Sequence, residues 1–260
     1  MLSKQVVSIL ERCYTVQSNI PPTVLFNEGW MLRIIVDWFF SKQTSNHPLS
    51  FPEDGKWYSE ALLPSTFLPR YRGDKFSESY THVDGAIGHF NIGSSGEGDL
   101  AVTEDSTHLV LLEAKMFSKL SSGVKNAWYY NQAARNVACM AEVLRRGNRN
   151  PTDFEKLGFF VLAPESQIEA GVFSNKMSND SISEIVNRRI DEYDGDKSDW
   201  MTDWFKPLMQ KIEIGLISWE ELIRLIAKND PDVGEQLDNF YSLCLKYNCR
   251  KIINNTRTSF

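Results

Sequence analysis

The most constraining feature of this sequence is an apolar segment that ends in two opposite charges. Residues 108–116, HLVLLEAKM, form the kind of apolar run, preceded by polar residues, that predicts a largely buried β-strand. Side chains alternate along a strand, so Leu111, Glu113 and Lys115 are expected on one face. Burial of a carboxylate and an ammonium costs free energy unless they pair or bind an ion. The segment therefore predicts either a surface hairpin with a Glu–Lys ion pair or a built polar site.

A second carboxylate, Asp99, precedes Glu113 by 14 residues. If residues 99–103 and 108–116 form a hairpin centred on Ser106, Asp99 lies opposite Glu113 on the same face. Two carboxylates at that separation repel each other unless a cation lies between them. Oxygen ligands suit Mg²⁺ or Mn²⁺ better than zinc. The spacing therefore predicts a divalent-metal site.

A third acid, Glu28, falls on the apolar face of a helix expected over residues 23–41. Leu25, Leu32 and Ile35 are three residues before, four after and seven after it. A carboxylate that faces the core needs a partner. A shared metal ion is one candidate, and Arg33 is the other if Glu28 lies at the margin of the helix face.

The chain as a whole predicts an α/β fold in which helices flank a mixed central β-sheet. Residues 1–165 are expected to form the core with its N-terminal helices, and residues 166–260 a mostly helical C-terminal α/β extension packed on the same domain. Asp84-Gly85 predicts a tight hairpin turn, so Asp84 is interpreted first as a turn residue and only second as an extra acidic ligand. The other expected elements are irregular chain from Ser45 to Pro69, helices over 3–16, 125–146, 181–192, 218–228 and 231–247, and strands over 157–163 and 212–217. Ser218 and Glu221 have capping-box spacing.

Composition narrows the class of protein. The chain has 260 residues, four scattered cysteines and a formal net charge of −6. No apolar run approaches the roughly 20 residues that span a bilayer, and the start lacks the pattern of a secretory signal. We therefore expect a cytoplasmic protein with reduced thiols and no membrane partner. The negative charge argues against a tight nucleic-acid-sequestering protein, but it allows an enzyme that releases its product.

The order of these features resembles the restriction-endonuclease-like PD-(D/E)XK nuclease superfamily over residues 23–165. The resemblance rests on a helical acid, an aspartate, a Glu-x-Lys triplet and a glutamine in the next helix: Glu28, Asp99, Glu113-Ala114-Lys115 and Gln132. Two positions depart from the pattern. Gly98 replaces the proline before the aspartate, and Asn136 stands where a tyrosine follows the glutamine in some branches.

The resemblance implies a Mg²⁺-dependent nuclease, with Mn²⁺ as a substitute, that hydrolyses the phosphodiester bonds of DNA and leaves a 5′-phosphate. Asp99, Glu113 and the Ala114 carbonyl would ligate the ion, and Glu28 would bind it directly or through water. Lys115 would orient the attacking water or stabilise charge on the phosphate. Gln132 would position Lys115, water or the substrate. Whether cleavage is endonucleolytic, and whether the chain forms a homo-oligomer, stay open.

Basic and aromatic residues near this motif in sequence could contact the nucleic acid. The candidates are Arg70, Arg72, Lys75, Lys119, Lys125, Tyr130 and Arg135. The alternative is that the charges are ordinary solvated loop residues and that the aromatic ring belongs to the core.

Two other functional classes compete with the nuclease. A catalytically inactive protein with the nuclease fold could serve as a nucleic-acid-binding or scaffolding module. A metal-independent partner-binding protein could carry residues 98–116 as an ordinary hairpin. A zinc site is disfavoured because the four histidines are dispersed.

Overall fold

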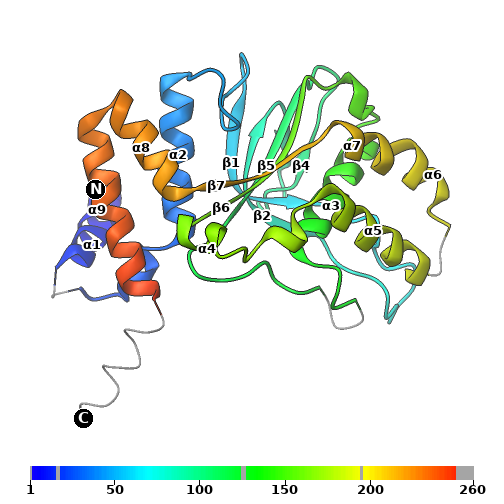
Figure 1. Cartoon of the computed structure of the whole chain (residues 1–260), viewed down its shortest axis with the longest axis horizontal. Coiled ribbons are helices and arrows are strands. Elements are labelled where there is room, and N and C mark those ends of the chain that lie inside the picture. Colours follow the sequence, from blue (N-terminus) through cyan, green and yellow to red (C-terminus); the bar gives the residue numbers. More distant parts are fainter. Residues whose placement is uncertain (1, 16–17, 124–126, 194–195, 250–260) are drawn as a thin grey trace, which may run out of the picture.

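The computed structural model describes residues 2–15, 18–123, 127–193 and 196–249. Within these ranges the centre is a five-stranded mixed sheet in the order β1-β2-β5-β6-β7 (Figure 1). Its strands are β1 Lys56–Leu63, β2 Thr81–Gly88, β5 His108–Ala114, β6 Lys156–Ala163 and β7 Glu213–Ser218. The α/β class with a mixed sheet flanked by helices is thus confirmed.

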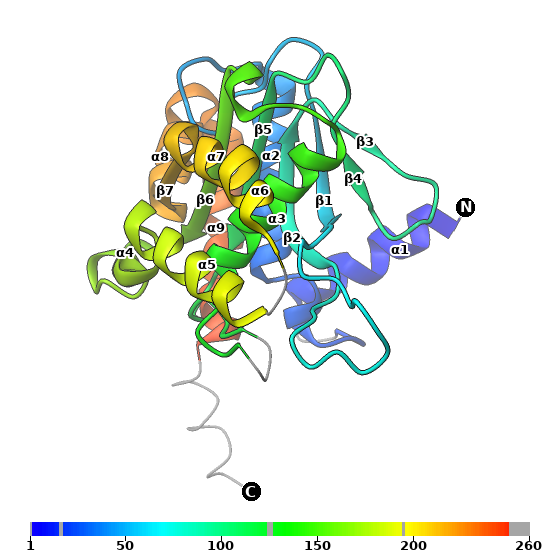
Figure 2. The same cartoon turned by 90° about the vertical axis from the view of Figure 1, so that its right-hand side faces the viewer.

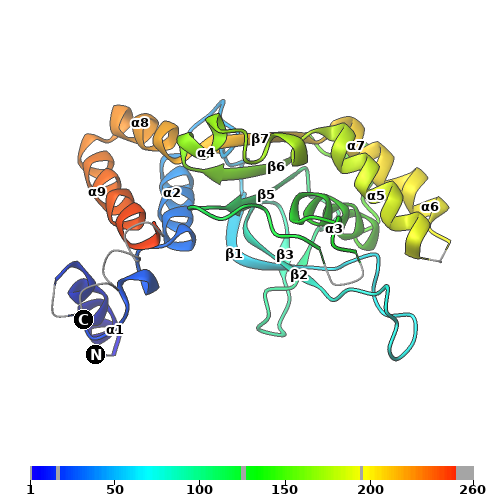
Figure 3. The same ribbon diagram turned by 60° about the horizontal axis from the view of Figure 1, so that its bottom comes forward.

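Helices cover both faces of this sheet. They are α1 Leu2–Glu11, α2 Glu28–Lys42, α3 Gln132–Arg146, α4 Glu165–Glu169, α5 Asn179–Tyr193, α6 Ser198–Trp200, α7 Lys206–Lys211, α8 Trp219–Asn229 and α9 Pro231–Asn248. Figures 1 and 3 show α2, α8 and α9 on one side of the sheet, and α3, α5 and α7 on the other. Two buried apolar clusters follow this division: Leu111 belongs to the cluster under α3, and Leu112 to the cluster under α2. Alternation along β5 therefore serves two cores at once.

The type of strand pairing changes once across the sheet, at β5. β1, β2 and β5 are antiparallel neighbours, whereas β5, β6 and β7 run parallel. A parallel connection needs a crossover, and α3 supplies the one between β5 and β6. The last strand, β7, comes from the C-terminal third of the chain, so residues beyond 165 complete the sheet.

Capping residues set where the two central helices begin. Asn27 accepts a hydrogen bond from the backbone N–H of Trp30, and α2 starts at Glu28 rather than near residue 23. Asn131 accepts from the N–H groups of Ala133 and Ala134, and α3 starts at Gln132 rather than at 125. A side-chain oxygen at the N-cap satisfies N–H groups that have no partner within the helix. A prediction from apolar spacing alone places both helix starts too early, because it does not take these N-cap residues into account.

Two expectations about the first strands are wrong. The segment from Ser45 to Pro69 contains β1, and Asp84-Gly85 lies inside β2 instead of forming a hairpin turn. A Cβ added to Gly85 would lie 3.1 Å from Leu32 Cδ2 of α2. The glycine therefore allows α2 to pack closely on the sheet, and it makes no turn.

The remaining elements lie close to expectation. β5, β6, β7, α5, α8 and α9 match their predicted ranges to within about two residues at each end. Ser218 Oγ accepts a hydrogen bond from the N–H of Glu221 at 3.0 Å, as the capping box predicts. Among the described residues, none of the helices is long and apolar enough to cross a membrane.

Candidate active site

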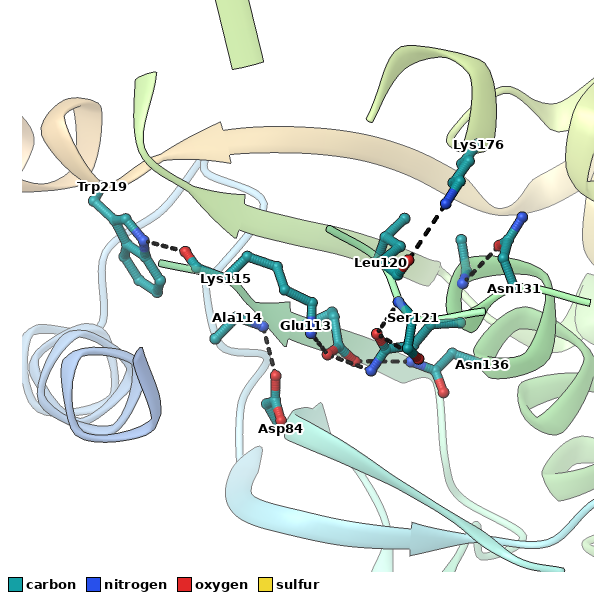
Figure 4. A network of polar contacts seen from close by, with 12 residues as sticks. Asp84, Glu113, Ala114, Lys115, Leu120, Ser121, Asn131, Asn136, Lys176 and Trp219 are labelled. Atoms are coloured by element: carbon teal, nitrogen blue, oxygen red, sulfur yellow. Dashed lines mark hydrogen bonds and ion pairs between the residues drawn. The ribbon is translucent and has the colours of Figure 1, made fainter. Parts of the chain in front are cut away.

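Glu113 is the centre of a buried polar network at the carboxyl end of β5 (Figure 4). Its side chain is 1% exposed. Lys115 Nζ donates to Glu113 Oε1 at 2.6 Å, and Gln132 Nε2 donates to the same oxygen at 2.5 Å. Asn136 Nδ2 donates to Glu113 Oε2 at 3.1 Å. The predicted pairing of Glu113 with Lys115 on one strand face is therefore confirmed.

The carboxylate beside Glu113 is Asp84, which comes from β2. The register pairs Gly85 with Leu112, so Asp84 faces Glu113 across adjacent antiparallel strands. Asp84 Oδ2 accepts a hydrogen bond from the backbone N–H of Ala114 at 2.7 Å (Figure 4). The sequence interpretation ranked this residue as an acidic ligand only second, because Asp-Gly is a common turn signal.

A local distortion of the sheet accompanies Asp84. The β1–β2 ladder pairs Ser59 with Gly85 and Ala61 with Val83, and the pair that would join Glu60 to Asp84 is missing. Glu60 has a φ of +58°, which a non-glycine residue adopts at a cost of about 1–3 kcal/mol. Backbone strain of this kind is often found at functional sites. It therefore supports a functional role for Asp84, which lies opposite Glu60, independently of the hydrogen bond to Ala114.

Electrostatics distinguish Glu113 from an ordinary surface carboxylate. Burial and the charge of Asp84 raise the pKa of Glu113 to about 8, against the opposing influence of the Lys115 ammonium. The side chain is therefore stabilised when it binds a proton, or an equivalent cation, at neutral pH. When Glu113 is ionised, two carboxylates face one ammonium, and a bound cation can neutralise the excess negative charge.

Asp99 does not join this network, so the predicted hairpin between Asp99 and Glu113 is wrong. Asp99 directly precedes β4 (Leu100–Ala101), which pairs with β3 (Asn91–Ile92), and it forms a bridge with Leu62 of β1. Figure 2 shows this small hairpin beside β1. Since β1 and β2 separate it from β5, Asp99 lies two strands away from Glu113. Its carboxylate instead accepts a hydrogen bond from Ser95.

Glu28 also lies apart from the Asp84–Glu113 pair. It lines a cavity together with Met116 and Lys119, and its charge acts on the thiol of Cys244. Arg33, the alternative partner, forms its ion pair with Glu60 at 3.3 Å instead. The expectation that Glu28, Asp99 and Glu113 converge on one ion is therefore wrong. Among the residues that the structure describes, no group of three or more His, Cys, Asp or Glu side chains is arranged around a common metal position.

The start of α3 supplies the amide groups of the site. Gln132 is the first residue of that helix, and its Oε1 accepts hydrogen bonds from the N–H and hydroxyl of Ser121 at 3.2 and 3.3 Å. Gln132 thus links Glu113 to the segment that follows β5, rather than contacting Lys115. Asn136 lies one turn further along. It was interpreted as a departure from the family pattern, yet it contacts Glu113, and its Oδ1 has no hydrogen-bond partner within the described ranges.

The predicted nucleic-acid contacts have different surroundings. Tyr130 is 0% exposed, so the prediction that its ring stacks on a base is wrong. Arg70 binds Asp74 through two nitrogens at 2.9 and 3.2 Å. Arg135 is half-buried in α3 and acts electrostatically on buried Glu78. The exposed candidates are Arg70, which is paired with Asp74, together with Arg72, Lys75 and Lys119; Lys125 lies outside the described residues.

Comparison with known proteins gives this site no precedent. No protein-family model, curated protein or solved structure matches the chain. The chemistry of the site therefore has to be argued from its own geometry.

Proposed function

We propose that this chain is a Mg²⁺-dependent nuclease that hydrolyses phosphodiester bonds of DNA, with Asp84 and Glu113 as the ligands of the ion. One observation carries the proposal: a buried glutamate, an aspartate from the adjacent strand and a lysine two residues along meet at the end of β5. Glu28 and Asp99 have no part in this proposed centre.

The donor set fits a hard divalent cation. Carboxylate oxygens of Asp84 and Glu113 are the ligands that Mg²⁺ and Mn²⁺ prefer, and the Ala114 carbonyl is the third oxygen implied by the family resemblance. Burial, and after it the charge of Asp84, raises the pKa of Glu113, and a bound cation would offset both effects. Asn136 and Gln132 hold the glutamate in one orientation, as hydrogen-bonded outer residues do in known metal sites.

The proposed roles divide between the ion and the chain. A divalent ion would supply Lewis acidity toward the scissile phosphate and make a nucleophilic water available at neutral pH. Lys115 would stabilise the negative charge that develops on the phosphate. Gln132 would link the position of Glu113 to the segment after β5, through its bonds to Ser121. Exposed Arg72, Lys75 and Lys119 are proposed to contact the DNA backbone.

The proposed family is the restriction-endonuclease-like PD-(D/E)XK superfamily, with one change of residue from the sequence motif. The helix, the Glu-x-Lys strand and the Gln-bearing helix follow in the order on which the resemblance rests. The aspartate of the motif is assigned to Asp84 in place of Asp99. The Gly-Asp99 match is then a coincidence of spacing.

A cleavage assay with two different aspartate variants tests the proposal. Purified protein is expected to cleave DNA with Mg²⁺ or Mn²⁺ and to lose that activity in Asp84→Asn, Glu113→Gln and Lys115→Ala. Asp99→Asn is the matched control, since it makes the same chemical change two strands away, and it should retain activity. Loss of activity in Asp99→Asn with full activity in Asp84→Asn would reverse the assignment of the ligand.

A catalytically inactive nuclease-fold module is the second candidate, and one observation favours it. Lys115, Gln132 and Asn136 already satisfy the oxygens of Glu113 without an ion. Titration calorimetry with Mn²⁺ separates the two candidates, because an inactive module of this kind should give no heat that depends on Glu113. The nuclease should give such heat and lose it in Glu113→Gln.

A further inference from the structure

A cavity of about 780 Å³ lies beside the proposed active site, on the α2 side of the sheet. Three segments form its walls: the start of α2, the segment after Lys115 and the end of α9. The residues that line it are Glu28, Met116, Phe117, Ser118, Lys119, Asn248 and Cys249. Its volume lies within the usual range for pockets that bind small organic groups. Met116, one of the residues of its wall, directly follows Lys115 in the chain.

Partly buried hydrogen bonds hold the walls of the cavity together. Asn248 Nδ2 donates to the carbonyl oxygens of Phe26 and Cys244 at 2.7 and 2.8 Å, which ties the end of α9 to the chain just before α2. Trp219 Nε1 donates to the carbonyl oxygen of Lys115 at 2.9 Å (Figure 4). The cavity is therefore preformed, and a ligand need not order its walls on binding.

The side chains around the cavity combine an aromatic ring, a cation and an acceptor. Phe117 is 37% exposed and lines the cavity, so its ring is accessible to a ligand there. Lys119 is exposed and can meet a phosphate, and the carboxylate of Glu28 can accept hydrogen bonds from an amino group. A nucleotide has the matching groups: a flat π surface, amino donors on the base edge and an anionic phosphate.

We propose that this cavity receives one unpaired base next to the scissile phosphate, so that the substrate is single-stranded or locally unpaired nucleic acid. This inference rests on the proposed function. A base within an intact duplex cannot reach such a cavity unless it leaves the stack. Stacking in place of many phosphate contacts also agrees with the net charge of −6, because stacking needs few basic residues.

Binding of two DNA forms tests the inference with the full-length chain. Fluorescence anisotropy in EDTA should show tighter binding of a short single strand than of a blunt duplex of the same sequence. Phe117→Ala should weaken single-strand binding about tenfold, and Phe117→Trp should preserve it. The control is Phe76→Ala, a phenylalanine of similar exposure (38%) outside the cavity, which should leave binding unchanged. Equal binding of both DNA forms, or no effect of Phe117→Ala, would overturn the inference.

A substrate without a base separates this inference from the proposed function. Hydrolysis of bis(p-nitrophenyl) phosphate with Mn²⁺ should require Glu113 and should not respond to Phe76→Ala, the control outside the cavity. If this hydrolysis occurs but single strands are not bound more tightly than duplexes, the proposed nuclease function is supported and the proposed base-binding role of the cavity is contradicted. If single strands bind in a Phe117-dependent way but no hydrolysis occurs, the base-binding role of the cavity is supported and the proposed nuclease function is contradicted. Single-strand binding that rises more than tenfold in the full-length double variant Ile252→Ser, Ile253→Ser would assign the cavity to the C-terminal segment and overturn the inference.

Discussion

Two buried glutamates, Glu113 on β5 and Glu142 on α3, have nearly the same exposure but opposite electrostatics. Glu113 is 1% exposed and Glu142 is 2% exposed. Burial would raise the pKa of Glu142, but hydrogen bonds from Arg145 and Arg146 outweigh it and lower the pKa below its usual value. Burial raises the pKa of Glu113, and Asp84 adds to that rise. The comparison teaches that burial alone does not identify a functional carboxylate; the balance of charge around it does.

The difference in partners explains the difference in role. Arg145 and Arg146 place three guanidinium hydrogen bonds of 2.8 to 2.9 Å on Glu142, so its charge is fully compensated. Glu113 has one ammonium and two neutral amides, and a second carboxylate beside it. We therefore interpret Glu142 as structural and Glu113 as able to bind a further cation.

The largest expected difference is in catalysis. Glu113→Gln should lower Mn²⁺-dependent hydrolysis by about a thousandfold, since such a change removes a metal ligand and its charge. Glu142→Gln makes the same change of atoms and should leave the rate within about threefold. Initial rates on one oligonucleotide measure both variants. A thousandfold loss in Glu142→Gln as well would erase the distinction between the two glutamates.

Metal binding should separate the two variants by thermal stability. Mn²⁺ at about a hundred times its Kd should stabilise the wild type by about 2.7 kcal/mol, because the ion binds the folded chain. Glu142→Gln should keep this stabilisation, and Glu113→Gln should lose it. Differential scanning calorimetry with Mn²⁺, and with EDTA as reference, gives the shift in Tm. An equal shift in all three proteins would place the ion elsewhere.

Stability without metal should change in opposite directions. Glu142→Gln should destabilise the fold by about 1–2 kcal/mol, because two arginines lose a charged acceptor; their partial exposure keeps the loss modest. Glu113→Gln should stabilise it by on the order of 1 kcal/mol at pH 8.5, since a buried carboxylate with an incomplete set of partners is replaced by a neutral group. Urea denaturation in EDTA measures both. A destabilised Glu113→Gln would mean that its pairing with Lys115 outweighs the burial of charge.

The smallest expected effect is in the dependence of stability on pH. The pKa of Glu113 rises from an ordinary value of 4.5 to about 8 on folding, so the folded state holds this proton more tightly. Its contribution to stability is complete below pH 4.5 and is lost as pH rises through about 8. Glu142 has the opposite sign: its contribution is present at higher pH and is lost as pH falls. Unfolding free energies of wild type and Glu113→Gln between pH 5 and 9 should converge at the acidic end, and parallel curves would contradict the assignment.

The sequence predicted those parts of the site that depend on local pattern. Alternation along β5 predicted that Glu113 and Lys115 share a face, and the position of Gln132 on the following helix predicted that it belongs to the same site. Asp84 was ranked as a ligand only second because its role depends on which strand pairs with β5, and strand pairing between distant segments is not encoded in the spacing of either one. Val83 before Asp84 and the apolar pair Ala86-Ile87 after it, all buried, are the signal that could have indicated one continuous strand instead of two joined by a turn.

Irregular structure limited the fold prediction in the same way. β1 was missed because its segment lies among prolines and serines. In addition, Glu60 has a positive φ, which interrupts the alternation of side chains along the strand. Asn136 was set aside because it does not match a tyrosine, although an asparagine can donate to a carboxylate from the same helix position. Caps at Asn27 and Asn131 fixed helix starts that apolar spacing alone could not locate.

The bond from Trp219 to the carbonyl of Lys115 joins residues 104 positions apart. During synthesis on the ribosome, the strands with Asp84 and Glu113 emerge long before Trp219 does. Until most of the polypeptide has been made, the nascent chain lacks the hydrogen bond from Trp219 to the Lys115 carbonyl. It also lacks β7, the strand that pairs in parallel with β6. If the chain is the nuclease proposed above, its site would be completed late in synthesis, which would spare nearby nucleic acid while translation is still in progress.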